Sequence, residues 1–123
     1  MLGYVTIGVN DMERAEVFYN ELLSKVGARQ LMDVDRLKMY GIGLDKGMLA
    51  ICLPYDEQDP SPGNGNMVAI PAGSREGVDQ MYAKAIELGA TDEGEPGDRN
   101  PVFYGAYVRD LDGNKLCFYE ANM

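Results

Sequence analysis

Two stretches of this chain are similar enough to indicate an internal repeat. Residues 40–52, YGIGLDKGMLAIC, parallel residues 104–119, YGAYVRDLDGNKLCFY. Each begins with Tyr-Gly, continues as an apolar strand, turns at an Asp/Lys/Gly cluster and enters a second apolar strand. Asp112 and Gly113 provide the positive-φ residues that a tight two-residue turn needs, and residues 115–119 then alternate like a half-buried strand. The chain is therefore expected to contain one module twice.

The repeat extends to the start of each half. Residues 4–11, YVTIGVND, align with residues 67–74, MVAIPAGS, and each is followed by apolar residues at helical spacing. Residues suited to begin and end a helix bound both segments: Asp11 and Ser74 at the start, Gly27 and Gly89 at the end. Each half thus reads as a strand, a helix and three strands, which predicts an α+β fold of tandem βαβββ modules.

The predicted elements divide the chain into two modules and a connection. Strands are expected at residues 2–9, 29–34, 37–42, 48–53, 67–71, 90–93, 102–109 and 115–119, and helices at residues 12–26 and 75–88. Residues 95–101 are expected to form a polar loop. Residues 54–66, PYDEQDPSPGNGN, lack periodicity and suit either a lid or a linker, and the repeat favours a linker.

Length predicts how the modules fold. Neither half of the 123 residues can bury much apolar surface alone, so the two are expected to share one core. We therefore predict a single domain over residues 1–123, with module one at about 1–53, the linker at 54–66 and module two at about 67–123.

Composition excludes several classes of function. A net charge of −9 argues against binding to nucleic acid or anionic lipid, because neutralising phosphates needs clustered Lys and Arg. No apolar run approaches a membrane span, and the first residues lack the pattern of a signal peptide. Cys52 and Cys117 lie in apolar strands, which indicates reduced thiols in a cytoplasmic protein, although a disulfide between them stays open.

The chain contains no histidine. No Ser-His-Asp or Cys-His pair can form within it, no imidazole can act as a base near neutral pH, and a metal ion would lack its commonest nitrogen ligand. Any chemistry must use carboxylates, tyrosines, thiols, lysines or the backbone.

The alternation of the strands places small and polar side chains on the sheet faces away from the helices. These residues are the predicted ligand-binding set: Tyr4, Thr6, Ala50, Cys52, Met67, Ala69, Lys115, Cys117 and Tyr119. For any one of them, packing in a second core layer is the simpler interpretation. For the faces as a whole we expect the wall of a ligand cavity. Alternation alone does not decide which way Tyr40, Tyr104 and Tyr107 point.

The chain resembles the vicinal oxygen chelate superfamily, which includes glyoxalase, extradiol dioxygenase, fosfomycin-resistance and bleomycin-resistance proteins. The resemblance rests on the helix that follows Asp11 and contains Phe18 and Tyr19, on the strand-helix restart at Met67, and on residues 110–116, DLDGNKL, which are close to that family's usual Asp-Pro-Asp-Gly-Asn turn. It covers essentially the whole chain. It implies that the modules form a partial barrel around a central cavity, and the fold hosts several unrelated chemistries.

Metal-dependent members of that superfamily place ligands on the first and last strands of each module, and these positions are Tyr4, Ala50, Met67 and Cys117 here. The usual divalent ion prefers imidazole and carboxylate ligands, so this set does not suit it. Cys117 and Met67 could attract a soft metal, but two sulfur atoms are weak evidence for a site. We therefore expect no metal ion and no other cofactor.

Three functions stay open at this point. The first is a metal-free protein that binds a small molecule in the cavity, as bleomycin-resistance members do; there Lys115 would favour an anionic ligand if its ammonium group did not extend to solvent. The second is an enzyme, such as a lyase, isomerase or thiol transferase similar to lactoylglutathione lyase, with Cys117 or Tyr4 as the catalytic candidates or with an unusual metal site. The third is a structural or interaction protein, and a homodimer is compatible with all three.

Overall fold

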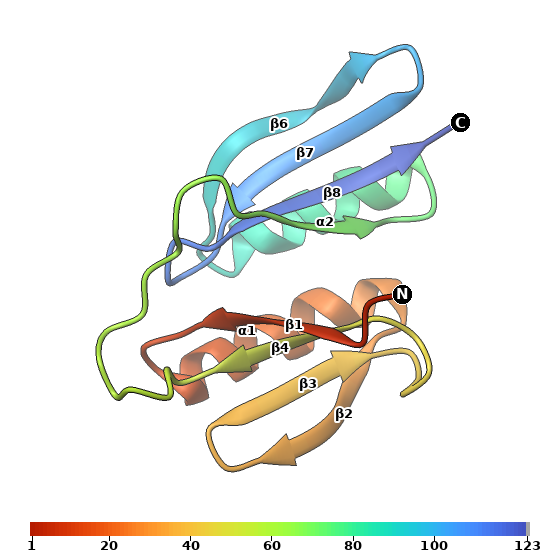
Figure 1. Cartoon of the computed structure of the whole chain (residues 1–123). Helices are drawn as coiled ribbons and strands as arrows, with labels where there is room; N and C mark the ends of the chain where they lie inside the picture. Colours follow the sequence, from red (N-terminus) through yellow and green to blue (C-terminus); the bar gives the residue numbers. More distant parts are fainter. Residues whose placement is uncertain (123) are drawn as a thin grey trace. The chain divides into compact units, whose positions relative to one another are not determined.

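The computed structural model describes residues 1–122 and divides the chain into two compact units, one of residues 1–62 and one that begins at Gly63 (Figure 1). The division falls within the segment predicted as the linker, and residues 53–67 contain neither helix nor strand. Each unit has the order strand, helix, three strands that the repeat predicts. That the two units fold as a single domain stays a prediction.

The first unit is a four-stranded mixed sheet with one α-helix. Its elements are β1 (Tyr4–Gly8), α1 (Met12–Leu23), the short 3-10 helix η1 (Ser24–Val26), β2 (Arg29–Val34), β3 (Leu37–Gly41) and β4 (Met48–Cys52). The strands lie in the order β1-β4-β3-β2, with β1 parallel to β4 and the other pairs antiparallel. The predicted helix over residues 12–26 is thus an α-helix that tightens in its last turn.

The second unit repeats this arrangement. Its elements are β5 (Val68–Pro71), α2 (Arg75–Glu87), β6 (Thr91–Asn100), β7 (Phe103–Arg109) and β8 (Lys115–Ala121). The strands lie in the order β5-β8-β7-β6, and β5 is parallel to β8. The prediction of tandem βαβββ modules is confirmed. No helix among the residues described is long and apolar enough to cross a lipid bilayer.

Both helices begin at the predicted residues. The carboxylate of Asp11 accepts a hydrogen bond from the backbone N–H of Arg14 at 3.1 Å, and the hydroxyl of Ser74 accepts one from the N–H of Gly77 at 2.9 Å. Each bond satisfies an amide that has no partner within the helix. Left-handed glycines follow both helical segments: Gly27, with φ 77°, and Gly89, with φ 105°.

Each helix packs on one face of its own sheet, and the core of each unit lies between them (Figure 1). The largest side chains of these cores are almost fully buried: Phe18, Tyr19, Leu22, Tyr40 and Ile51 in the first unit, and Val78, Met81, Val108, Leu116 and Phe118 in the second. Burying side chains of this size contributes about 1.5–3 kcal/mol each. The two cores therefore orient each sheet relative to its helix.

The predicted polar loop at residues 95–101 is wrong. Residues 91–100 form the ten-residue strand β6, which pairs with β7 through several register shifts. Because β6 is an edge strand, Pro96 does not interrupt a ladder on both sides, and irregular pairing is tolerated there. Pairing with the next strand, β7, overrides the low strand propensity of this segment.

The turn between β7 and β8 also differs from the prediction. Gly113 has a positive φ of 87°, but Asp112 is not among the non-glycine residues with positive φ in the described chain. The connection is instead a longer loop in which the N–H of Asp110 donates to the carbonyl of Asn114 at 2.9 Å. A two-residue hairpin turn is therefore not present.

Candidate functional site

The sheet of the second unit has one face without a helix, and the strand register assigns side chains to it. Cys117 on β8 lies opposite Ala69 on β5 and opposite Tyr107 on β7. Directly opposed residues share a face, and their chain neighbours point to the other face. Leu116 and Phe118 are such neighbours, and they are fully buried on the side of α2. Ala69, Tyr107 and Cys117 therefore form one row on the helix-free face.

An aromatic pair lies beside this row. Tyr119 is opposite Gly105 on β7, and its ring stacks on that of Phe103, with centroids 5.3 Å apart and planes 5° from parallel. A Cβ atom on Gly105 would lie 2.7 Å from the Phe103 ring. Because Gly105 has no side chain, the Phe103 ring can lie over it and stack on Tyr119.

Two cations converge on the Tyr107 ring from the strands on either side of β7. The guanidinium carbon of Arg99, on β6, lies 5.3 Å from the ring centroid, and Lys115 Nζ, on β8, lies 5.4 Å from it. These distances suit cation–π contacts. Six residues form the helix-free face of the second unit: Ala69, Phe103, Tyr107, Lys115, Cys117 and Tyr119. Arg99 lies at the β6 edge of this face.

Two glycines of β6 make room for Arg99. A Cβ atom on Gly97 would lie 3.0 Å from Arg99 Nη1, and one on Gly94 would lie 3.2 Å from Arg99 Nη2 and 3.0 Å from the Tyr107 ring. Arg99 Nη2 also donates a hydrogen bond of 2.6 Å to the carbonyl of Glu95. The bulged strand β6 therefore holds the guanidinium group of Arg99 close to the β6 backbone and above the Tyr107 ring.

Burial determines the protonation states of Cys117 and Tyr107, which lie opposite each other on β8 and β7. It raises the pKa of the Cys117 thiol above its ordinary value, and this effect exceeds the opposing influence of a hydrogen bond to Tyr107 and of the charges on Arg99 and Lys115. Burial, together with the neighbouring Cys117, also raises the pKa of the Tyr107 hydroxyl. Both groups are therefore protonated and uncharged near neutral pH.

The predicted binding residues of the first unit lie on β1 and β4. Thr6 is opposite Ala50, and Cys52 is opposite Gly8, so Thr6, Ala50 and Cys52 share a face with Tyr4. Tyr4 is about half exposed, Cys52 is half-buried and Ala50 is fully buried. The predicted set thus falls into one group on each unit, the second including Met67, which is exposed just before β5. That both groups line one cavity stays a prediction.

Tyr40 and Tyr104 point toward the helices of their units. The Tyr40 side chain is buried, with its ring centroid 6.4 Å from that of Tyr19 on α1, and its hydroxyl accepts a hydrogen bond from Gln30 Nε2 at 3.3 Å. Tyr104 donates to a carboxylate oxygen of Asp79, on α2, at 2.7 Å. Of the three tyrosines that the sequence left open, Tyr107 is therefore the one on a helix-free face.

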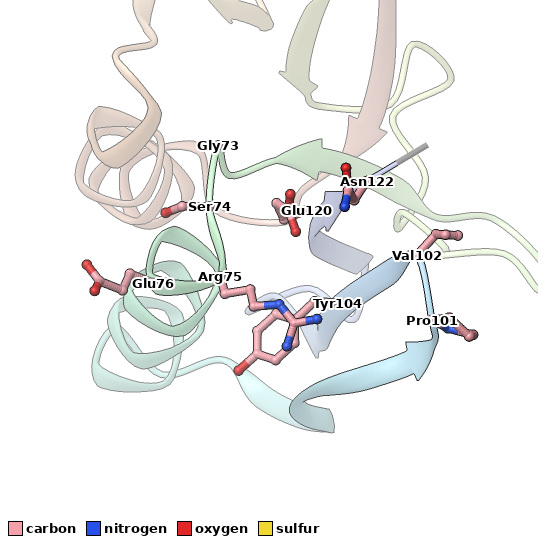
Figure 2. Close-up of a pocket in the computed structure, with 9 residues that line it drawn as sticks. All are labelled: Gly73, Ser74, Arg75, Glu76, Pro101, Val102, Tyr104, Glu120 and Asn122. Carbon is pink, nitrogen blue, oxygen red and sulfur yellow. The ribbon is translucent and has the colours of Figure 1, made fainter.

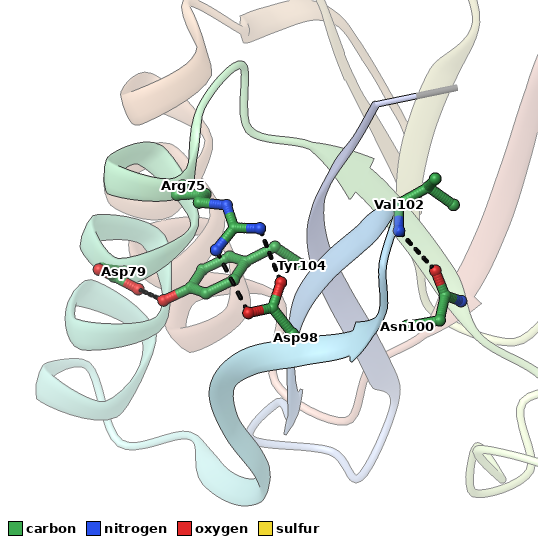
Figure 3. A network of polar contacts seen from close by, with 6 residues as sticks. All are labelled: Arg75, Asp79, Asp98, Asn100, Val102 and Tyr104. Carbon is green, nitrogen blue, oxygen red and sulfur yellow. Dashed lines mark hydrogen bonds and ion pairs between the residues drawn. The ribbon is translucent and has the colours of Figure 1, made fainter.

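A polar network surrounds Tyr104 on the side of α2 (Figure 3). Arg75 makes two bonds to the carboxylate of Asp98, at 2.7 and 3.3 Å, and its guanidinium carbon lies 4.7 Å from the Tyr104 ring centroid. The network joins the start of α2 to β6 and β7. Within it Arg75 and the carboxylates of Asp79 and Asp98 all have partners in the protein, so no ligand is needed to pair them.

Arg75 and Tyr104 also line a hollow of about 480 Å³ at the end of the second unit (Figure 2). Its wall comes from the start of α2, the β6–β7 turn and the end of β8: Gly73, Ser74, Arg75, Glu76, Pro101, Val102, Tyr104, Glu120 and Asn122. Arg75 and Tyr104 are engaged with acidic side chains of the unit, so they are less available to a ligand than Arg99 and Lys115.

The four positions at which related proteins would hold a metal do not fit a divalent ion. Ala50 has no donor atom, Met67 offers only a thioether, and the buried Cys117 thiol is protonated. Within residues 1–122, no group of three or more His, Cys, Asp or Glu side chains could hold a metal ion. Tyr4 alone contributes an oxygen, which is too little for such an ion.

Sequence reasoning missed Arg99 and Phe103 and did not assign Tyr107. Arg99 was placed in the expected loop at residues 95–101, and only pairing with β7 brings it onto the helix-free face. One usable signal was the pair Gly94 and Gly97, because glycine within a strand often marks a bulge or a close approach.

Comparison with known proteins identifies relatives of this fold. The sequence model of the Glyoxalase/Bleomycin resistance protein/Dioxygenase superfamily matches residues 1–118. No curated protein matches the chain significantly. A glyoxalase/bleomycin resistance protein from Albidiferax ferrireducens T118 is 34% identical, with a TM-score of 0.91 and coverage of 99% of both chains.

Two more distant structures share the fold. Hypothetical protein SA1046 from S. aureus is 23% identical, with a TM-score of 0.76, over 98% of this chain and 93% of its own. The fosfomycin resistance protein FosX from Mesorhizobium loti is 20% identical, with a TM-score of 0.71, over 100% of this chain and 93% of its own. At this level of identity the similarity concerns the fold alone.

Proposed function

Because the chain belongs to the glyoxalase/bleomycin resistance protein/dioxygenase superfamily, we propose that it binds a small organic molecule without a resident divalent metal ion. Members of this superfamily typically bind small molecules. The relative from Albidiferax ferrireducens, described as a glyoxalase/bleomycin resistance protein, supports this class of function at 34% identity. Location in the cytoplasm and assembly as a homodimer are parts of the proposal that rest on the sequence.

The observation that carries the proposal is the chemistry at the family's ligand positions. A phenol, a methyl group, a thioether and a buried, protonated thiol stand where an ion would need imidazole or carboxylate donors. The protein retains aromatic and polar groups beside Cys117 that suit an organic ligand: Tyr107, Tyr119 and Phe103. Apolar walls with a few polar groups are typical of small-molecule sites.

An enzyme that uses a thiolate is less well supported. A nucleophilic cysteine requires a lowered pKa and access to solvent, whereas Cys117 is fully buried and its pKa is raised. Tyr4, the other catalytic candidate, is about half exposed on β1. Binding is therefore the function that these side chains favour.

Metal analysis of protein purified without a histidine tag tests the proposal. We expect far less than one equivalent of nickel, zinc, iron or manganese, and a melting temperature that does not change with EDTA. Compounds that bind should raise the melting temperature equally with and without EDTA, because ligands that bind only the folded state stabilise it by mass action. A stoichiometric metal ion that is lost, together with ligand binding, on chelation would overturn the proposal.

A further inference from the structure

We propose that the ligand of this protein is an organic carboxylate, and that Arg99 and Lys115 bind its charged group beside Tyr107. The inference rests on the proposed function, because it names the chemical class of the molecule bound on the helix-free face. It goes beyond that function in assigning the residues that recognise the ligand's charge.

The first argument is convergence. Arg99 and Lys115 come from β6 and β8, which lie on the two sides of β7, and both approach the ring of Tyr107 within 5.4 Å. Like charges near one ring raise the local positive potential, which favours an anion. A negatively charged group bound beside the ring would therefore be attracted by both cations.

The second argument is charge pairing. The chain has 20 acidic and 11 basic residues, so carboxylates are abundant. In the second unit the other cations pair with them: Arg75 with Asp98, Lys84 with Glu87 and Arg109 with Glu93. In the part of the chain that the structure describes, neither Arg99 nor Lys115 has a carboxylate within ion-pair distance. These two cations are thus available to an external anion.

The third argument is the chemistry of the donors. A guanidinium group carries five N–H donors, and Arg99 directs some of them to the carbonyl of Glu95 and the hydroxyl of Tyr107, which leaves others for a ligand. Arginine recognises carboxylates through paired bonds, and lysine adds a point charge. The neutral hydroxyl of Tyr107 and the protonated thiol of Cys117 add no competing negative charge.

The fourth argument concerns the rest of the ligand. The stacked rings of Phe103 and Tyr119 provide a flat apolar surface on the same face as Cys117 and Tyr107. Such a surface suits a planar or aromatic body attached to the charged group. Benzoate is therefore a suitable probe, and benzamide is its uncharged counterpart of nearly the same shape.

Titration of the full chain with benzoate and benzamide at low salt, followed by NMR, tests the inference. The variants are Arg99→Gln and Lys115→Gln, which each remove one cation from the face. Lys84→Gln is the matched control, because it removes the same charge from α2, where the partly buried Lys84 pairs with Glu87. Circular dichroism establishes that each variant is folded.

We expect benzoate to bind and to perturb amides near Arg99, Tyr107 and Lys115, with affinity about tenfold weaker in either site variant and unchanged in Lys84→Gln. Benzamide should bind at least about tenfold more weakly than benzoate. Equal affinity for both probes, or benzoate affinity that neither site variant lowers, would overturn the carboxylate assignment but leave small-molecule binding intact. Failure of benzoate to bind would also overturn the assignment, whereas the proposed function fails separately, in the metal analysis.

Discussion

The buried carboxylate of Asp110 is joined by hydrogen bonds to both the backbone and the side chain of the buried Asn114. The Asp110 carboxylate accepts one from the backbone N–H of Asn114 at 2.8 Å and one from its side-chain amide at 3.1 Å. The same carboxylate accepts from the N–H of Asp112 at 2.9 Å. This side chain therefore organises the connection from β7 to β8, and with it the register that places Cys117 opposite Tyr107.

Replacing Asp110 with Ala should lower the free energy of unfolding by roughly 2–4 kcal/mol, because buried amides lose their acceptor. Urea denaturation measures the change. Asp45→Ala in the corresponding turn of the first unit is the control, since Asp45 is exposed, and its effect should stay within about 0.5 kcal/mol. Equal effects of the two substitutions would show that the Asp110 carboxylate does not stabilise its turn.

Replacing Gly97 with Ala should weaken benzoate binding with little loss of stability. The new Cβ would lie 3.0 Å from Arg99 Nη1, the end of a flexible side chain that can move aside at low cost. We expect the free energy of unfolding to change by less than about 1 kcal/mol, since Ala suits a strand at least as well as Gly does. Gly3→Ala, where a Cβ meets nothing within 4 Å, is the control. Unchanged benzoate affinity in Gly97→Ala would contradict a role for the position of Arg99.

The Cys117 thiol should make stability fall at alkaline pH. Because its pKa in the folded state is raised above 9.0, the stability gained by keeping the thiol neutral is complete below about pH 9 and is lost as pH rises through the folded-state pKa. Cys117→Ala removes this titration, so its free energy of unfolding should decline less steeply as the pH rises above about 9. Parallel declines in the two proteins, measured by urea denaturation, would indicate a thiol that is not buried in solution.

A single domain should lose stability as a unit. Ile51 is fully buried in the first unit, and Ile51→Val should cost about 1 kcal/mol by leaving a small cavity. If the units share one cooperative transition, hydrogen exchange monitored by mass spectrometry should show weaker protection of β7 and β8 as well as of β3 and β4. A loss of protection confined to residues 1–62 would show that the units unfold independently.

The local signals in the sequence predicted most of the fold. The Asp11 and Ser74 caps, the left-handed glycines and the periodicity of the helices are properties of short segments, and each is confirmed. Strand β6 could not be predicted in the same way. Its ten residues, TDEGEPGDRN, have a polar, turn-like composition, and β7 supplies the hydrogen bonds that make them a strand.

The candidate site, like the fold, was predicted only in part from the sequence. By itself the sequence determined that two βαβββ modules are present, that Cys117 lies on a strand face away from the helix, and that imidazole is absent, because alternation and composition are local properties. Only the tertiary structure decided what surrounds Cys117. Arg99 reaches Tyr107 through a bulged pairing between β6 and β7, and the register shifts of that pairing depend on backbone hydrogen bonds between the two strands, which the alternation of neither strand specifies.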